Sequence, residues 1–152
     1  MEYKGFEKFD RTIVVENEDF LTMIEPGYDI VTTGKFKGSS AEKVIEYSKT
    51  KNKEIKYIMF SHSHGDHVGN LPFYLKRIQN DVKLLGHTNS PLFKRLLQNG
   101  MIRKEQSVKI SKDSLFFEKE ENKIKVLCTP GHTIYSEDIS MYLPNQKMLF
   151  IG

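Results

Sequence analysis

The sequence has a single cysteine, no long apolar run and almost no excess of charge of either sign. Cys128 cannot form an internal disulfide, so nothing in the cysteine content indicates an oxidising compartment. No stretch approaches the roughly 18 apolar residues of a membrane-spanning helix. Residues 1–8 carry charges throughout and lack the apolar centre of a signal peptide. We therefore expect a cytoplasmic protein with no membrane partner.

The net charge of +3 comes from 23 basic and 20 acidic residues. This excess is too slight to indicate a nucleic-acid partner. The densest basic patch lies between residues 49 and 56, and we interpret it as a solvated loop after a helix. We therefore expect no nucleic acid as a partner.

The length and composition fit one globular domain. The chain has 152 residues, of which 38% are hydrophobic and 28% charged, enough for a core of its own. There is no internal repeat, low-complexity tract or linker. We therefore treat residues 1–152 as a single domain.

Strand and helix patterns alternate along the first two thirds of the chain. Ser39, with Glu42 three residues later, predicts a helix start by a capping box. Further helices are expected from near Asn70 and from Ser90 to Gly100. Short apolar runs predict strands at residues 11–16, 20–25, 55–60, 82–86, 115–119, 123–128, 138–143 and 147–151. This order predicts an α/β (α+β) fold, a mixed sheet with helices on at least one face.

A cluster of histidines follows one of the predicted buried strands. In extended backbone, residues i and i+2 point to the same side, so His62 and His64 can face one metal ion. Gly65 would let the chain turn sharply, which aims Asp66 and His67 at a second point nearby. Neutral imidazole and carboxylate are ligands that suit zinc. The spacing therefore predicts a metal site.

A catalytic zinc needs three protein ligands and an open position. The candidate for the third ligand is His132, in a turn after the strand at 124–128, which could lie beside the strand at 55–60. Two ions about 3.5–4 Å apart can hold a bridging hydroxide and polarise a scissile carbonyl or phosphoryl group. Asp66 could orient that water and is our candidate catalytic residue.

These motifs resemble those of the metallo-β-lactamase superfamily. Residues 62–67 match the signature His-x-His-x-Asp-His, and residues 129–133 resemble the next motif. Residues 20–27 resemble the early strand that usually ends in Asp-x-Gly, with Glu25 in place of the aspartate. The resemblance implies an αββα sandwich. It also implies that His62, His64 and His132 hold a first metal ion, and that Asp66 and His67 belong to a second.

The resemblance is incomplete at its last motif. Residues 148–152 resemble the strand that leads into a bridging aspartate, and the chain stops one residue before that position. By this comparison the chain supplies five of the usual seven ligands and the N-terminal portion of the sandwich. Such a half sandwich leaves a sheet edge and an apolar face uncovered. We expect either a fragment of a longer protein or a homodimer in which two copies cover each other.

The resemblance implies a zinc-dependent hydrolase acting on a small-molecule substrate. One or two Zn²⁺ ions, with iron or manganese as alternatives, would hold a hydroxide that attacks an ester, thioester, lactone, amide or phosphodiester. A di-iron oxidoreductase on the same fold is one alternative, although its flavin-partnered members typically carry glutamate where this chain has His64. A ribonuclease-type hydrolase usually adds a basic exosite or a further domain, which is not visible here. The last alternative is a catalytically incomplete metal-binding fragment.

Overall fold

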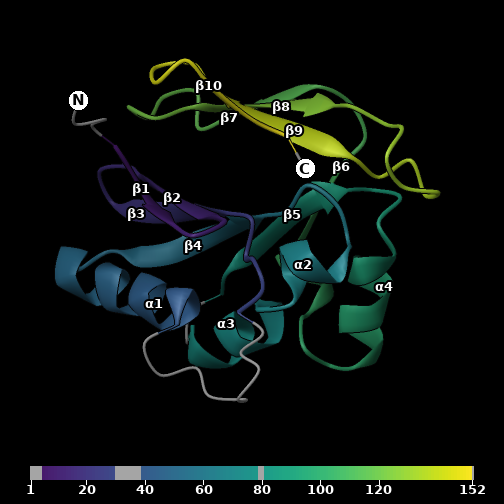
Figure 1. Cartoon of the computed structure of the whole chain (residues 1–152), viewed down its shortest axis with the longest axis horizontal. Coiled ribbons are helices and arrows are strands. Elements are labelled where there is room, and N and C mark those ends of the chain that lie inside the picture. Colours follow the sequence, from purple (N-terminus) through teal and green to yellow (C-terminus); the bar gives the residue numbers. More distant parts are fainter. Residues whose placement is uncertain (1–4, 30–38, 79–80, 152) are drawn as a thin grey trace.

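The computed structural model describes residues 5–29, 39–78 and 81–151. Residues 1–4 and Gly152, which entered the predictions above, lie outside this part. The described elements form three layers: helices, a six-stranded sheet and a four-stranded sheet (Figure 1). The four-stranded sheet covers the face of the larger sheet that the helices leave open.

The larger sheet is mixed, as predicted. Its strand order is β1-β2-β3-β4-β5-β6. The first two pairings are antiparallel and the last three are parallel. The strands are β1 (Phe6–Phe9), β2 (Thr12–Glu16), β3 (Phe20–Ile24), β4 (Glu54–Met59), β5 (Lys83–His87) and β6 (Ser107–Ile110).

The smaller sheet is antiparallel throughout, with strand order β10-β9-β8-β7. Its strands are β7 (Ser114–Phe116), β8 (Ile124–Cys128), β9 (Ile139–Leu143) and β10 (Met148–Ile151). The sequence suggested that β8 lies beside β4, and this prediction is wrong. Strand β8 lies in the opposite sheet, so His132 approaches the histidine cluster from across the sandwich.

The helices begin where the capping residues predict. Ser39 Oγ accepts a hydrogen bond from Glu42 N at 3.2 Å, and Ser90 Oγ accepts one from Leu92 N at 3.3 Å. Asn70 directly precedes the third helix. The helices are α1 (Ser40–Lys51), α2 (Gly65–Val68), α3 (Leu71–Arg77), α4 (Pro91–Gln98) and the 3₁₀ helix η1 (Lys104–Gln106). Among the described residues, no helix is long and apolar enough to cross a membrane.

Two apolar cores hold the layers together, one on each face of the larger sheet. Alternate residues of a strand serve alternate cores. In β2, for example, Val14 faces the helices, whereas Ile13 and Val15 face the second sheet. Because both faces are covered, β2 and β3 are buried along almost their whole length. The mixed α/β class predicted from the sequence is confirmed.

Several element boundaries differ from the prediction. The strand predicted over residues 115–119 ends at Phe116, because Phe117 has a φ of 59° and leaves the extended conformation. Helix α4 ends at Gln98, before Gly100. Strands β1 and β6 and helix α2 were not predicted. Strand β6 is notable because it lies in the first sheet, where it pairs in parallel with β5.

Candidate metal centre

The histidine cluster lies where strand β4 ends, between the two sheets. Phe60 N continues the pairing of β4 by donating to Leu85 O at 3.1 Å, and the chain then enters the loop that carries His62 and His64. His132 comes from the loop between β8 and β9. Ile139 N, at the start of β9, donates a backbone hydrogen bond to Ser61 O at 3.1 Å and so ties the end of the His132 loop to the His62 loop.

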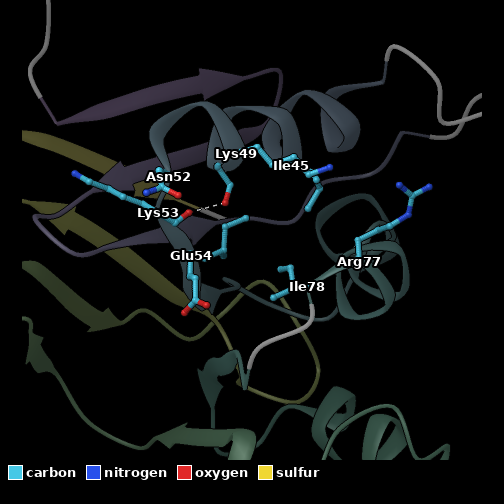
Figure 2. A pocket seen from close by; sticks show the side chains of 9 residues that line it. Ile45, Lys49, Asn52, Lys53, Glu54, Arg77 and Ile78 are labelled. Carbon is cyan, nitrogen blue, oxygen red and sulfur yellow. Dashed lines mark hydrogen bonds between the residues drawn. The ribbon is translucent and has the colours of Figure 1, made fainter.

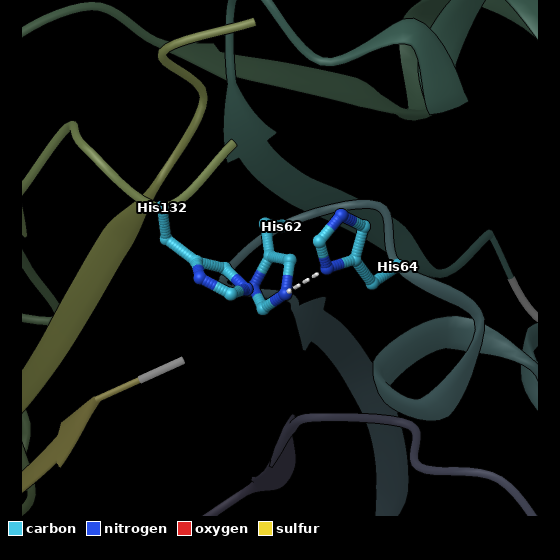
Figure 3. Close-up of side chains that lie close together, drawn as sticks. All are labelled: His62, His64 and His132. Atoms are coloured by element: carbon cyan, nitrogen blue, oxygen red, sulfur yellow. Dashed lines mark hydrogen bonds between the residues drawn. The ribbon is translucent and has the colours of Figure 1, made fainter. Parts of the chain in front are cut away.

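His62, His64 and His132 converge on one point (Figure 3). Each offers a ring nitrogen, and these three atoms lie within 4.8 Å of one another. The nearest pair is His62 Nε2 and His64 Nδ1, 3.1 Å apart. His62 is fully buried, whereas the other two are exposed. The triad therefore has a buried floor and an open side, and its donors fit a metal ion with a free coordination position.

The surroundings of His62 favour the form that binds a metal. Burial is the main cause that lowers the pKa of His62, and the neighbouring His67 lowers it further. Its Nδ1 lies 2.8 Å from Ser61 Oγ. A neutral ring that donates from Nδ1 to this hydroxyl leaves Nε2 free as a ligand.

Glu25 supports the cluster from the position directly after strand β3. Its Oε1 accepts a hydrogen bond from Ser61 N at 2.7 Å, and its Oε2 lies 2.9 Å from His67 Nδ1. This hydrogen bond is the main cause that raises the pKa of His67, against the opposing effect of burial. Glu25 has a φ of 59°, which is unusual for a residue with a side chain. Glu25 thus holds both the backbone of the histidine loop and the His67 ring in place.

Asp66 and His67 lie beside the triad and face each other. His67 Nε2 is 3.5 Å from Asp66 Oδ2, which also lies 3.3 Å from Arg11 Nη1. The Asp66 side chain is about half exposed. Within residues 5–29, 39–78 and 81–151, the histidine triad is the only group of three or more candidate ligands close enough together to hold one metal ion. The roles assigned to Asp66 and His67 as ligands, and to Asp66 in catalysis, stay predictions.

Gly65 does not provide the sharp, glycine-dependent turn that we predicted from the sequence. Gly65 is the first residue of helix α2, and its φ is not positive. A Cβ atom built there would meet nothing within 4 Å. The turn after His64 comes from helix initiation, with His64 as the extended residue before α2, and it does not require glycine.

A cavity of about 630 Å³ lies next to the Asp66–His67 pair. Its walls include Phe6 and Arg11 from the β1–β2 hairpin and Phe150 and Ile151 from β10. A second cavity, of about 480 Å³, lies among Lys49, Lys53, Arg77 and neighbouring residues (Figure 2). That second cavity touches the first residues of β4, at the end of the strand away from the histidines, so the cavity beside Asp66 is the better candidate for substrate.

Two acidic residues of the His132 loop were missed by the sequence analysis. Asp138 Oδ2 accepts backbone hydrogen bonds from Gly131, His132 and Thr133 at 3.4, 3.3 and 3.1 Å. Burial, the largest single effect, raises the pKa of Asp138, but these bonds together lower it. Glu137 is fully buried and bonds to Ser63. No spacing rule would have identified either residue, because both act through the folded loop.

The sequence model of the metallo-beta-lactamase superfamily matches residues 11–152. The chain belongs to the metallo-β-lactamase superfamily. The match covers the histidine cluster, the His132 loop and nearly all of both sheets. No curated protein sequence matches the chain.

Solved structures of this superfamily share the fold at low sequence identity. The DIM-1 metallo-β-lactamase has a TM-score of 0.64 at 16% identity, covering 93% of this chain and 57% of its own. The mono-zinc form of the FIM-1 metallo-β-lactamase from Pseudomonas aeruginosa has a TM-score of 0.60 at 22% identity, covering 91% and 54%. A flavo di-iron protein from Thermotoga maritima has a TM-score of 0.60 at 22% identity, covering 87% and 30%. The chain thus spans a little more than half the length of the two lactamases.

Proposed function

We propose that this chain binds zinc through His62, His64 and His132 and serves a hydrolase that cleaves an ester, thioester, lactone, amide or phosphodiester. The observation that carries the proposal is the convergence of three imidazole nitrogens within 4.8 Å, on a buried floor with an open side. Membership of the metallo-β-lactamase superfamily supports the same reading.

In this proposal each residue around the triad has a separate task. A divalent ion held by the triad would supply an activated water and polarise the scissile group. Ser61 holds Nδ1 of His62, and Glu25 holds Nδ1 of His67, so that the Nε2 atom of each ring is left to bind a metal ion. The Asp66 carboxylate would orient the attacking water. The cavity beside Asp66 and His67 takes the substrate.

The Asp66–His67 pair is proposed as the protein's contribution to a second metal position. Its fit rests on chemistry: a carboxylate oxygen and the Nε2 atom lie 3.5 Å apart, and Glu25 fixes the ring. The last residues of β10 line the same cavity as this pair. Zinc, iron or manganese would suit such a mixed nitrogen and oxygen site.

A di-iron oxidoreductase is the second candidate function. It is favoured by the likeness of the fold to the flavo di-iron protein from Thermotoga maritima and to a structure described as a peroxy di-iron species of the chemotaxis sensor ODP, which has a TM-score of 0.66 at 14% identity. The imidazole of His64, where flavin-partnered members typically carry a carboxylate, favours the hydrolase.

Elemental analysis of the purified chain tests the metal site and separates the two candidates. We expect zinc in the wild-type chain and its loss in His62→Ala, because that substitution removes the buried ligand of the triad. His87→Asn is the matched control: His87 lies at the end of β5 and accepts from Asn89 N at 3.1 Å, outside the triad. Unchanged zinc in His62→Ala would refute the ligand assignment, and iron with oxidase activity would favour the second candidate.

Hydrolysis is tested separately on a panel of chromogenic esters, thioesters, phosphodiesters and β-lactams. We expect turnover of at least one class by the zinc-loaded chain and a loss of about 100-fold in Asp66→Asn, in line with the usual contribution of an acid–base group. A zinc-loaded chain that turns over no member of the panel would contradict the hydrolase proposal while leaving the metal site intact.

A further inference from the structure

One buried carboxylate next to the triad has no part in the chemistry proposed above. Glu137 is fully buried in the loop between β8 and β9, five residues after His132. Its Oε1 accepts a short hydrogen bond of 2.6 Å from Ser63 Oγ. Its Oε2 is buried and has no hydrogen-bond partner among the described residues. Burying a carboxylate with a single partner is costly, which suggests that the contact with Ser63 serves a purpose.

The Ser63–Glu137 hydrogen bond connects the two halves of the metal site. Ser63 stands between His62 and His64 in the loop after β4, whereas Glu137 belongs to the loop that carries His132. Together with the bond from Ile139 N to Ser61 O at 3.1 Å, it joins loops that come from different sheets. This link therefore runs from the loop of His62 and His64 to the loop of His132.

Hydrogen bonds within the His132 loop connect Glu137 to His132. Thr133 Oγ1 accepts a hydrogen bond from Glu137 N at 3.4 Å and donates to Asp138 Oδ2 at 3.2 Å. The same Asp138 oxygen accepts from His132 N at 3.3 Å. Glu137 and the backbone of His132 thus belong to one hydrogen-bonded unit.

We propose that Glu137, acting through Ser63, is a positioning residue that sets the distance of His132 from His62 and His64 and so determines the affinity and geometry of the metal site. This inference rests on the proposed metal site. It concerns a residue that neither touches the metal ligands' ring nitrogens nor lines the substrate cavity.

The test uses Co²⁺ as the probe, because its visible absorption reports the arrangement of its ligands. The variants are Ser63→Ala, Glu137→Gln and the double variant. Ser48→Ala is the matched control, since Ser48 Oγ donates a 2.6 Å hydrogen bond to Lys53 O on the helix side of the molecule. For each variant, the Co²⁺ dissociation constant, the visible spectrum and the Tm of the metal-free chain are measured.

Ser63→Ala should weaken Co²⁺ binding by about 10- to 100-fold, the usual effect of removing a group that orients metal ligands, and alter the spectrum. It should also lower the Tm, because it leaves a buried carboxylate without a partner. Glu137→Gln keeps an oxygen that can accept from Ser63, so its spectrum should match that of the wild type. Ser48→Ala should bind Co²⁺ like the wild type.

The double variant separates positioning from a structural role. It removes both the hydroxyl and the buried charge, so its Tm should recover relative to Ser63→Ala, while its Co²⁺ affinity and spectrum should not. It also carries the test if Ser63→Ala does not fold. Recovery of Tm and Co²⁺ affinity together in the double variant, or wild-type affinity in Ser63→Ala, would overturn this inference but leave the proposed metal site standing. A wild-type chain that binds no Co²⁺ would overturn the metal site and this inference with it.

Discussion

Glu25, at the position where the resembling motif usually has an aspartate, holds two separate groups of the histidine loop. The Glu25 carboxylate reaches both Ser61 N and His67 Nδ1, at 2.7 and 2.9 Å. It does so from a backbone with a φ of 59°. The longer side chain and the unusual backbone together bring the carboxylate under the histidine loop.

We expect Glu25→Ala to destabilise the chain by about 1–3 kcal/mol, because it leaves the buried Ser61 N–H and the His67 ring without their acceptor. Urea unfolding of the metal-free chain would measure the loss. Glu46→Ala, at an exposed position of α1, serves as the control and should change stability by no more than about 0.5 kcal/mol. Equal stability of the two variants would show that Glu25 does not support the loop.

Glu16, which lies far from the histidines, makes the stability of the chain depend on pH. Its carboxylate lies 2.7 Å from Lys53 Nζ and 3.1 Å from Lys51 Nζ. The hydrogen bond from Lys53 is the main cause that lowers the pKa of Glu16 from its ordinary value of 4.5. A carboxyl with a lowered pKa in the folded state contributes stability above its unfolded pKa, and this stability is lost as the pH falls through the folded value.

The difference in unfolding free energy between the wild type and Glu16→Gln should therefore be largest near neutral pH. It should shrink as the pH falls below about 4.5, the ordinary value for this group. Taking the difference cancels the titration of the histidines, which both proteins share. Denaturant unfolding between pH 7 and pH 3 would measure it, and a difference that stays constant over that range would contradict the assignment.

At the scale of elements, the C-terminal end of β5 fits tightly under β4. A Cβ atom added at Gly86 would lie 2.2 Å from the ring of Phe60. Phe60 is fully buried and packs against Phe93, with ring centroids 5.5 Å apart, so it cannot move aside freely. Phe60 also directly precedes the loop that carries His62. The glycine is thus needed for packing between two strands.

Gly86→Ala should cost about 1–3 kcal/mol by overpacking, and it should loosen zinc binding because Phe60 is displaced. Thermal unfolding and zinc content would be measured together. Gly100→Ala is a poor control because of its φ of 67°, whereas Gly65→Ala has open space around it and should leave the Tm close to that of the wild type. A stable Gly86→Ala variant would show that the strands can separate at this point.

Element boundaries were predictable where a local signal exists. Ser39, Ser90 and Pro91 identified two helix starts because capping is a contact between near neighbours in the chain. Strands β1 and β6 have no such signal, and each is short and only partly buried. Their pairing partners, β2 and β5, determine that they become strands, and this is a property of the sheet.

At the scale of the whole molecule, the outer face of the four-stranded sheet presents a row of apolar and long side chains. The register aligns Leu149 with Tyr142, Tyr142 with Lys125, and Lys125 with Leu115 across the sheet. Leu149 and Leu115 are about half exposed, and Ile151 of the same sheet is 74% exposed. Apolar surface of this kind favours association.

We therefore predict that the isolated chain pairs through this face as a homodimer. Light scattering over a range of concentrations should give twice the chain mass, and Leu115→Lys with Leu149→Lys should shift it to that of a single chain. Lys125→Ala is a useful comparison, since it should leave the pairing intact. A single-chain mass for the wild type at high concentration would refute the pairing.

The candidate site could be recognised from the sequence alone. The histidine pair separated by one residue, and the aspartate and histidine that follow, predict a metal-binding loop because their spacing is a local property of the backbone. Helix caps and the alternation of apolar residues likewise depend on near neighbours. From these signals the fold class and the superfamily were predicted correctly.

The distant groups that support that loop are brought to it by the packing of the two sheets. His132 and Glu137 come from the loop between β8 and β9 of the opposite sheet, and Glu25 comes from the residue after β3. Their distances from the cluster depend on how two sheets pack and on which strands pair, and packing of this kind leaves no fixed spacing along the chain. The sequence could therefore name the candidate ligands, whereas the hydrogen bonds around them could be found only in the folded molecule.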